Sequence, residues 1–196
     1  GEIVGIAGVE GNGQREMIDA ITGLSKYSYG SIKLMGKEVK DMNIGDLRKT
    51  GLVHIPEDRN KAGLVGNMSV SDNLVLKTTK DPRFSDANGL HLKKKAIRNY
   101  ALEIQKKFDI RCSSVDQEAR NLSGGNQQKV ILARELEASP DLLIAVHPTR
   151  GLDIGATRFI HDTVIAQRGS GCGVLLISAD FDEILEVSDR ILVMFE

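Results

Sequence analysis

The sequence predicts an α/β fold with a mainly parallel sheet flanked by helices. Short apolar runs, rich in Leu and β-branched residues on both faces, alternate along the chain with amphipathic stretches. This alternation of strand and helix is typical of sheets whose parallel strands are joined by helical crossovers. Strands are expected at Ile3–Ala7, Ser31–Met35, Leu52–Ile55, Leu142–Val146, Val174–Ser178 and Arg190–Met194.

Helices are expected between these strands. The first is followed by Gly23, a residue type that commonly ends helices, and another stops before Pro140, which cannot continue one. The predicted helices are Arg15–Thr22, Gln127–Ser139, Thr157–Gln167 and Phe181–Val187.

The middle of the chain has no strand pattern and predicts an inserted helical subdomain. One helical stretch begins at Ser71-Asp72-Asn73, and a second, His91–Asp109, has apolar residues at four-residue spacing: Leu92, Ala96, Tyr100, Ile104 and Phe108. The other face of the second stretch is basic, which we interpret as a solvated face, with a docking surface for an acidic partner as the alternative. Residues 1–196 are expected to form one domain, with a core at about 1–68 and 122–196 and the helical subdomain at about 69–121.

Composition excludes several classes of protein. With 26 Lys and Arg against 27 Asp and Glu, the net charge of -1 argues against a nucleic-acid binder, which is normally basic. Two isolated cysteines, Cys112 and Cys172, form no disulfide framework or zinc motif, and no metal site is predicted. No run of 18 apolar residues predicts a membrane-spanning helix. Because Gly1-Glu2 leads directly into an apolar strand, we expect the chain to belong to a longer protein.

A glycine-rich loop follows the first expected strand. In GVEGNGQR, residues 8–15, the glycines have the spacing of the phosphate-binding loop GxxxxGK[ST], whose backbone N–H groups face phosphate oxygens at a helix N-terminus. The Lys position holds an uncharged Gln, and the Ser/Thr position holds an Arg, which cannot ligate magnesium. The loop is therefore either a weakened nucleotide site or a simple glycine-rich turn. Its candidate binding residues are Gly8, Gly11, Asn12, Gly13, Gln14 and Arg15.

A second motif, LSGGNQQK at residues 122–129, leads into another helix. Here the sequence resembles ABC-type ATPases, whose signature is LSGGQ, and the longer form resembles the variant of simple-sugar and nucleoside importers. The resemblance implies that a Ser hydroxyl and Gly N–H groups at a helix N-terminus bind the γ-phosphate of an ATP held by the opposite domain of a head-to-tail pair. The signature residues are Leu122, Ser123, Gly124, Gly125, Asn126 and Gln127.

The resemblance also locates positions that depart from the family pattern. Val146 stands where the family has the Asp that positions magnesium, and His147 stands where it has the Glu that activates water. Val cannot hold a metal, and His147 is interpreted as a strand-end His rather than a base. Ala179 replaces the switch His, so no intact catalytic residue is expected. Glu57, in place of the usual Gln, is a candidate cofactor-binding residue and Asp153 belongs to the D-loop, which the resemblance places at the dimer seam.

These departures predict a specialised half of a transporter. The resemblance implies an ATP-binding fragment of a bacterial ABC importer for simple sugars or nucleosides, lacking the upstream antiparallel strands and the aromatic residue that stacks on adenine. This half is expected to be deficient in hydrolysis, with ATP weak or absent at its own site and Mg²⁺ only at the partner site. Its expected partners are the other nucleotide-binding half of the same polypeptide, permease subunits and, indirectly, a substrate-binding protein, with no nucleic acid. The expected location is cytoplasmic, on the inner face of the cell membrane.

Two alternatives remain open. The domain could be a structural or regulatory module that no longer binds nucleotide, or it could come from an ABC ATPase that acts outside transport. The near-neutral charge and the LSGGNQQK form count against the second alternative. Of the two importer classes, the Val146-His147 pair favours the nucleoside importers.

Overall fold

The chain forms two compact units. A computed structural model describes residues 1–9, 11–86, 89 and 91–195. The first unit comprises Gly1–Ile55, Ala138–Pro148 and His161–Glu196, and the second comprises Pro56–Glu137 and Thr149–Ile160. The single-domain organisation with an insertion at about 69–121 stays a prediction.

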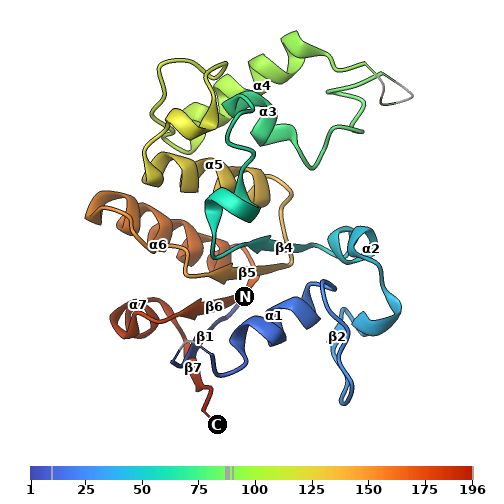
Figure 1. The fold of residues 1–196 in the computed structure, drawn as a ribbon, viewed down its shortest axis with the longest axis vertical. Helices are drawn as coiled ribbons and strands as arrows, with labels where there is room; N and C mark the ends of the chain where they lie inside the picture. The colour runs from blue at the N-terminus through green and yellow to red at the C-terminus, as the bar shows by residue number, and fades with distance from the viewer. Residues whose placement is uncertain (10, 87–88, 90, 196) are drawn as a thin grey trace. The chain divides into compact units, whose positions relative to one another are not determined.

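The first unit contains a five-stranded sheet in which every neighbouring pair is parallel (Figure 1). The strand order is β4-β5-β6-β1-β7. The mainly parallel sheet predicted from the apolar runs is therefore confirmed. The strands are β1 (Ile3–Ala7), β4 (Leu52–Ile55), β5 (Leu142–Val146), β6 (Gly173–Ser178) and β7 (Arg190–Val193).

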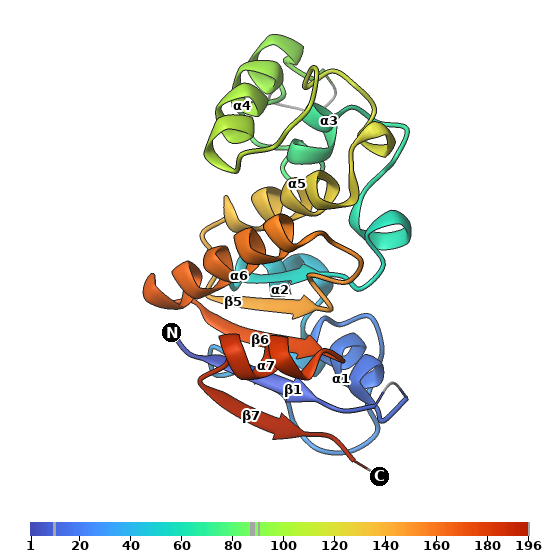
Figure 2. The same ribbon diagram turned by 90° about the vertical axis from the view of Figure 1, so that its left-hand side faces the viewer.

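Helices α1 (Gln14–Ile21) and α7 (Phe181–Val187) cover opposite faces of this sheet. Ile6 of β1 packs with Ile18 of α1 in one apolar cluster. The neighbouring Gly5 points to the other face, where a Cβ atom would collide with the Ser188 hydroxyl just beyond α7. Gly5 thus lets α7 pack closely on β1 and β6 (Figure 2).

The prediction of a strand at Ser31–Met35 was wrong in its length and its pairing. Only β2 (Lys33–Leu34) forms there, and it pairs antiparallel with β3 (Lys37–Glu38) in a separate two-stranded sheet. The turn residues Met35 and Gly36 both have positive φ, 49° and 77°, as a two-residue hairpin turn of type I′ requires. A short helix that the sequence did not predict, α2 (Ile44–Lys49), follows this hairpin.

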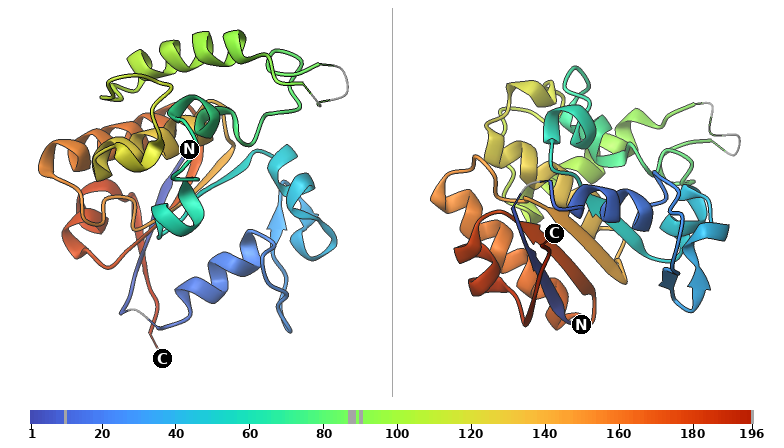
Figure 3. Two further views of the ribbon diagram at one scale, coloured as in Figure 1. Left: turned by 45° about the horizontal axis from the view of Figure 1, so that its top comes forward. Right: turned by 60° about the horizontal axis from the view of Figure 1, so that its bottom comes forward.

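The second unit is helical. Helix α3 (Val70–Val75) packs against both α4 (Lys94–Lys107) and α5 (Gly124–Leu136), which Figure 3 shows from two sides. A single π-helical turn, Arg59–Gly63, precedes them, and α6 (Ile154–Gly169) contributes its first residues to this unit and the rest to the first unit. None of the helices in the described part of the chain has the length and apolar character needed to cross a membrane.

Two helices begin three residues earlier than the periodicity predicted, because side chains cap them. Ser123 accepts a hydrogen bond from the Asn126 N–H and starts α5. Asp153 accepts one from the Ala156 N–H at 2.9 Å and starts α6. Such caps satisfy N–H groups that the first helical turn leaves without partners.

Candidate functional site

The glycine-rich loop connects β1 to α1 in the first unit. Gly11 and Gly13 have φ of 103° and 88°, which residues with a Cβ rarely adopt, and Gly13 directly precedes α1. The Gln14 side chain folds back and donates a hydrogen bond from Nε2 to the Val9 carbonyl at 3.1 Å. Two glycines of the loop therefore adopt left-handed conformations, while the amide at its Lys position is bonded to the loop itself. Glu10 lies outside the described residues.

Two further side chains define this loop. Asn12 donates from Nδ2 to the Met194 carbonyl at 3.3 Å, which ties the loop to the chain beyond β7. A Cβ atom at Gly8 would lie 2.9 Å from the same carbonyl, so the backbones approach closely there. Arg15, in the first turn of α1, is exposed and brings a positive charge beside the loop.

The carboxyl end of β5 carries Val146 and His147. Val146 is 6% exposed and packs in the apolar cluster with Ile18. His147 has a φ of 45°, and its ring Nδ1 accepts a hydrogen bond from the Ala179 N–H at 3.2 Å. In a neutral ring whose Nδ1 is the acceptor, Nε2 carries the proton. Such a ring has no free lone pair with which to take a proton from water.

Glu57 is neutralised by an arginine. Its carboxylate forms an ion pair with Arg150 in the second unit. Arg59 donates from Nη1 to the Arg150 carbonyl at 2.9 Å. The Arg59 guanidinium also covers Gly124, where a Cβ atom would lie 2.9 Å from Nη2. Among the described residues, no group of three or more His, Cys, Asp or Glu side chains is arranged to hold a metal ion.

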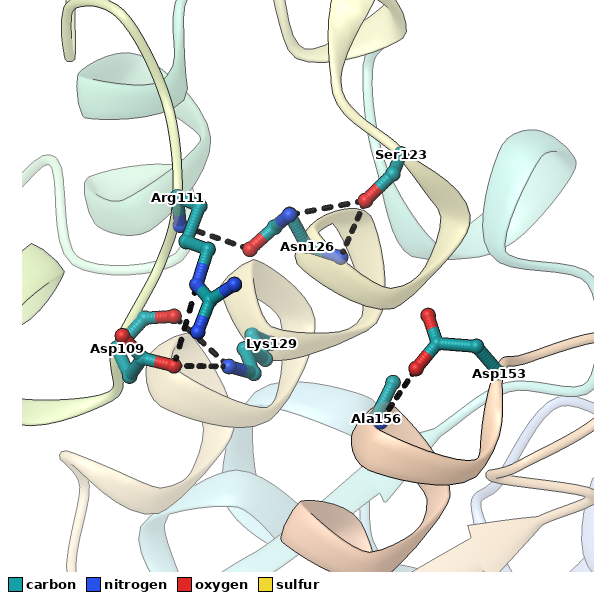
Figure 4. Close-up of polar contacts among 7 residues, drawn as sticks. All are labelled: Asp109, Arg111, Ser123, Asn126, Lys129, Asp153 and Ala156. Atoms are coloured by element: carbon teal, nitrogen blue, oxygen red, sulfur yellow. Dashed lines mark hydrogen bonds and ion pairs between the residues drawn. The ribbon is translucent and has the colours of Figure 1, made fainter.

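The signature residues lie around the N-terminus of α5 (Figure 4). Ser123 is exposed, and its Oγ accepts hydrogen bonds from the Asn126 side-chain amide at 2.9 Å and from the Asn126 N–H at 3.4 Å. Leu122 is buried, and Gln127 is buried with its Nε2 donating to the Ala119 carbonyl at 3.3 Å. Of Leu122, Ser123 and Gln127, only Ser123 exposes its side chain to a ligand at this terminus.

Helices α5 and α6 touch at Gly125. A Cβ atom at Gly125 would lie 2.7 Å from the Ala156 Cβ, shorter than real Cβ contacts. Asp153, which caps α6, is exposed next to this contact (Figure 4). The D-loop residue and the signature helix are thus neighbours within the second unit.

Lys129 fixes the signature helix from its buried side. Its Nζ donates to the backbone carbonyl and to the Oδ2 of Asp109, each at 2.8 Å, and lies 4.3 Å from the centre of the Phe159 ring. The hydrogen bond and charge of Lys129 lower the pKa of the Asp109 carboxyl. Arg111, two residues after Asp109, donates its backbone N–H to Asn126 Oδ1 at 2.7 Å.

The structure divides the predicted site residues into two groups. Those of the first unit are the glycine-rich loop, Val146, His147 and Ala179, and those of the second unit are the signature, Glu57 and Asp153. Sequence reasoning gave no role to Arg59, Arg150 or Asp109. The contacts of Arg150 with Arg59 and Glu57, and that of Asp109 with Lys129, join residues at least 20 positions apart, so no local spacing reveals them.

Comparison with known proteins matches residues 1–150 to the family described as ABC transporter. The chain is 47% identical over 196 residues to the nucleoside import ATP-binding protein NupA of Lactococcus lactis subsp. cremoris and 46% identical to the guanosine import ATP-binding protein NupO of Bacillus subtilis. It is 40% identical over 198 residues to the ribose import ATP-binding protein RbsA of Clostridium perfringens. These matches cover 100% of this chain and 38% of the length of each relative.

Two solved structures have the same fold. A nucleotide-free ATP-binding cassette from an ABC transporter has a TM-score of 0.80 and 23% identity, covering 99% of this chain and 77% of that one. A dimeric cassette in a post-hydrolysis state with ADP and phosphate has a TM-score of 0.76 and 23% identity, covering 98% and 81%. The family match over residues 1–150 shows that the chain belongs to the ABC transporter family, and these two structures share its fold.

Proposed function

We propose that this chain is one nucleotide-binding half of an importer ATPase for simple sugars or nucleosides, and that it hydrolyses little or no ATP at its own site. Its signature completes the ATP site of a partner half in the same polypeptide. The observation that carries the proposal is a contrast within the chain. Val146 is buried among apolar side chains where a carboxylate would hold magnesium, whereas Ser123 stays exposed at a helix N-terminus.

The chemistry of the first unit supports loss of hydrolysis. Phosphoryl transfer depends mainly on positioned charges, and removing one donor of this kind costs about 3–4 kcal/mol of transition-state stabilisation. Here Val146 offers no metal ligand and Ala179 offers no imidazole. His147 uses Nδ1 to accept the Ala179 N–H, which leaves it no lone pair for a base.

Nucleotide binding at this half's own site is proposed to be weak. The left-handed Gly11 and Gly13 fit the backbone turn that surrounds phosphates, and Arg15 adds a positive charge. Gln14 adds none, and no side chain of the loop resembles the hydroxyl that ligates Mg²⁺ in this family. We therefore expect Mg²⁺ to act with ATP only at the partner site, where ATP supplies the γ-phosphate that the signature binds.

The signature supports a role at the partner site. Ser123 and the following glycine N–H groups stand at the positive end of a 13-residue helix, which favours binding of an anion such as a γ-phosphate. Lys129 and Asn126 hold this helix to the chain after α4. We propose permease subunits and, through them, a substrate-binding protein as further partners, with the domain on the cytoplasmic side of the membrane.

The relatives guide the choice of substrate class. The nucleoside and guanosine import proteins are 47% and 46% identical to this chain, and the ribose import protein is 40% identical. Nucleosides are therefore the first class to test and simple sugars the second. Because the chain spans 38% of each of these proteins, uptake must be measured with the full-length protein in its transporter.

Substitution of the signature serine tests the proposed role. Ser123→Arg in the full-length protein should abolish both ATP hydrolysis and uptake, because the large cation fills the space where the γ-phosphate must approach Ser123. The matched control is Ser170→Arg, at an exposed serine in the first unit just beyond α6, which should leave both activities in place. Hydrolysis and uptake that survive Ser123→Arg would refute the proposal.

A module that binds no nucleotide is the second candidate, and one observation favours it. The Gln14 amide donates one of its two Nε2 hydrogens to the Val9 carbonyl within the loop, so it is only partly available to a phosphate. Titration of this chain with a fluorescent ATP analogue, with and without Mg²⁺, separates the possibilities. Weak binding that does not depend on Mg²⁺ supports our proposal, no binding supports the second candidate, and tight Mg²⁺-dependent binding contradicts both.

A further inference from the structure

We propose that Asn126 is a positioning residue that makes the Ser123 hydroxyl a hydrogen-bond donor toward the partner's γ-phosphate. The inference rests on the proposed function, because it assumes that Ser123 acts on the ATP of the partner half. It assigns a task to the one residue at which LSGGN departs from LSGGQ. The three groups involved, Arg111, Asn126 and Ser123, all lie in the second unit (Figure 4).

The first step is the orientation of the Asn126 amide. The Arg111 backbone N–H lies 2.7 Å from one end of the amide, and an N–H group requires an acceptor. This contact assigns the carbonyl Oδ1 to the Arg111 side. The Nδ2 group must therefore face Ser123, whose Oγ is 2.9 Å away.

The second step concerns the lone pairs of Ser123. A serine hydroxyl has two acceptor positions and one hydrogen to donate. The Asn126 side-chain amide occupies one acceptor position, and the Asn126 backbone N–H approaches the other at 3.4 Å. Since both donors come from Asn126, the hydroxyl hydrogen is left to donate to something else.

The third step is where that hydrogen can go. Ser123 is exposed, and among the described residues none accepts a hydrogen bond from its Oγ. Hydrogen bonds to a charged phosphate oxygen are short and roughly twice as strong as those between neutral groups. A hydroxyl already oriented as a donor needs no reorientation when the partner's ATP arrives.

The anchor of this arrangement lies one helical turn further along. Lys129 binds both the carbonyl and the carboxylate of Asp109 at 2.8 Å, and Asp109 is two residues before Arg111. These bonds hold the Arg111 backbone beside α5. The position of Asn126 is thus fixed by the chain that follows α4 and not by its own helix alone.

Asn126→Asp tests the proposal, because it preserves the shape and replaces the amide donor by a carboxylate acceptor. The Ser123 hydroxyl should then turn its hydrogen toward the new carboxylate, and the donor toward the γ-phosphate is lost. We expect the kcat of ATP hydrolysis of the full-length protein to fall by about the same factor as in Ser123→Ala, on the order of 10²-fold. Asn126→Ala only frees the Ser123 hydroxyl to rotate among about three staggered positions. It should therefore lower the kcat of ATP hydrolysis by roughly threefold.

A double-mutant cycle separates positioning from simple charge repulsion. In a Ser123→Ala background the hydroxyl is gone, so Asn126→Asp should lower kcat by less than about twofold if the two residues act as a unit. Affinity for ADP, which lacks the γ-phosphate, should not change in any variant. Circular dichroism and urea unfolding of each variant show that the fold is retained.

The outcomes distinguish this inference from the function on which it rests. If Ser123→Ala itself leaves hydrolysis intact, the proposed function fails and the inference falls with it. If Ser123→Ala is impaired but Asn126→Asp is not, or if Asn126→Asp costs the same factor in both backgrounds, only the inference is overturned. The inference stands if the loss from Asn126→Asp depends on the Ser123 hydroxyl.

Discussion

His147 Nδ1 accepts a hydrogen bond from the Ala179 N–H at 3.2 Å, so the chain contains an imidazole beside the position where the family pattern has one. The ring comes from the end of β5 instead of from the residue after β6. The His147 backbone N–H also bonds to the Ile177 carbonyl at 2.7 Å. The imidazole therefore joins the ends of two neighbouring strands and is held there as an acceptor.

His147→Asn tests whether this ring acts as a base. Asn keeps an acceptor for the Ala179 N–H and tolerates the φ of 45°, but it cannot take up a proton from water. Hydrolysis by the full-length protein should stay within about twofold of the unchanged protein, whereas loss of a general base costs about 10²–10⁴-fold. Steady-state ATPase assays measure this change. A loss of about 10²–10⁴-fold would contradict our account of His147.

Gly125→Ala should weaken the packing of α5 on α6. The new methyl group would lie 2.7 Å from the Ala156 Cβ, and neither atom is at the end of a flexible side chain. Overpacking of this kind costs about 1–3 kcal/mol in the free energy of unfolding. Urea unfolding of the purified protein provides the measurement.

Ala156→Gly supplies the matched variant for this contact. Alone it should cost about 0.5–1 kcal/mol, because glycine is unfavourable inside a helix. Combined with Gly125→Ala it should remove the clash, so the double variant should be more stable than the sum of the two losses predicts. Strict additivity would show that the two Cβ positions do not conflict.

The sequence predicted the parallel sheet well because β1, β4, β5 and β6 are mostly buried on both faces, whereas β7 at the edge is exposed. β1, β4 and β5 have the predicted bounds, and their apolar runs need no tertiary information to be recognised. The β2–β3 hairpin was missed because two-residue strands leave almost no periodic pattern. Its Met35-Gly36 turn depends on positive φ at a Met, which its side chain does not favour.

Helix α4 shows a second limit. The four-residue stripe predicted Leu92 as part of the buried face, but Leu92 is 45% exposed and precedes the helix. Ile104 and Phe108 of the stripe are buried, as predicted, but so are Ile97 and Ala101, which the stripe did not include. The face that α4 buries is set by its packing against α3, whose residues precede those of α4 by 19 positions or more. The candidate site has the same limit: motif spacing located Ser123, whereas the partners of Asn126 required the fold.

Asp109→Asn should give a pH-dependent loss of stability. Lys129 lowers the pKa of Asp109 from 3.8, so the charged form stabilises the folded state above that value and this contribution is lost as pH falls through the folded pKa. The difference in unfolding free energy between the two proteins should therefore be constant near neutral pH and shrink below pH 3.8. Asn also tolerates the φ of 47° at this position, so the exchange tests the charge.

Lys129→Met is the control for this pH dependence. Without the ammonium group, the loss caused by Asp109→Asn should depend less on pH between 2.5 and 7, a range that brackets the carboxyl pKa at about 4. The dependence that remains comes from Arg111, whose Nε lies 3.8 Å from Asp109 Oδ2 and also lowers the Asp109 pKa. Chemical denaturation at several pH values measures both pairs of proteins. A pH dependence that is undiminished in the Lys129→Met background would show that Lys129 is not its main cause.

Glu135→Ala should be among the most destabilising substitutions in the second unit. The Glu135 and Arg134 side chains are only 2% and 3% exposed, yet both sit on α5, where the sequence suggested an ordinary amphipathic helix. Glu135 Oε1 lies 2.9 Å from Arg134 Nε and 2.6 Å from Lys77 Nζ, and Arg134 Nη2 donates to the Gly63 carbonyl at 2.8 Å. Removing the carboxylate leaves a buried guanidinium without its counter-charge, which costs about 3–5 kcal/mol.

An exposed ion pair provides the comparison for Glu135→Ala. Arg98 and Asp116 form a contact of 2.9 Å, but their side chains are 53% and 55% exposed, so Arg98→Ala should cost no more than about 1 kcal/mol. Urea unfolding of both variants measures the two losses under one set of conditions. Equal losses would mean that burial does not decide the value of the Glu135 network, because the two contacts differ little in length and greatly in exposure.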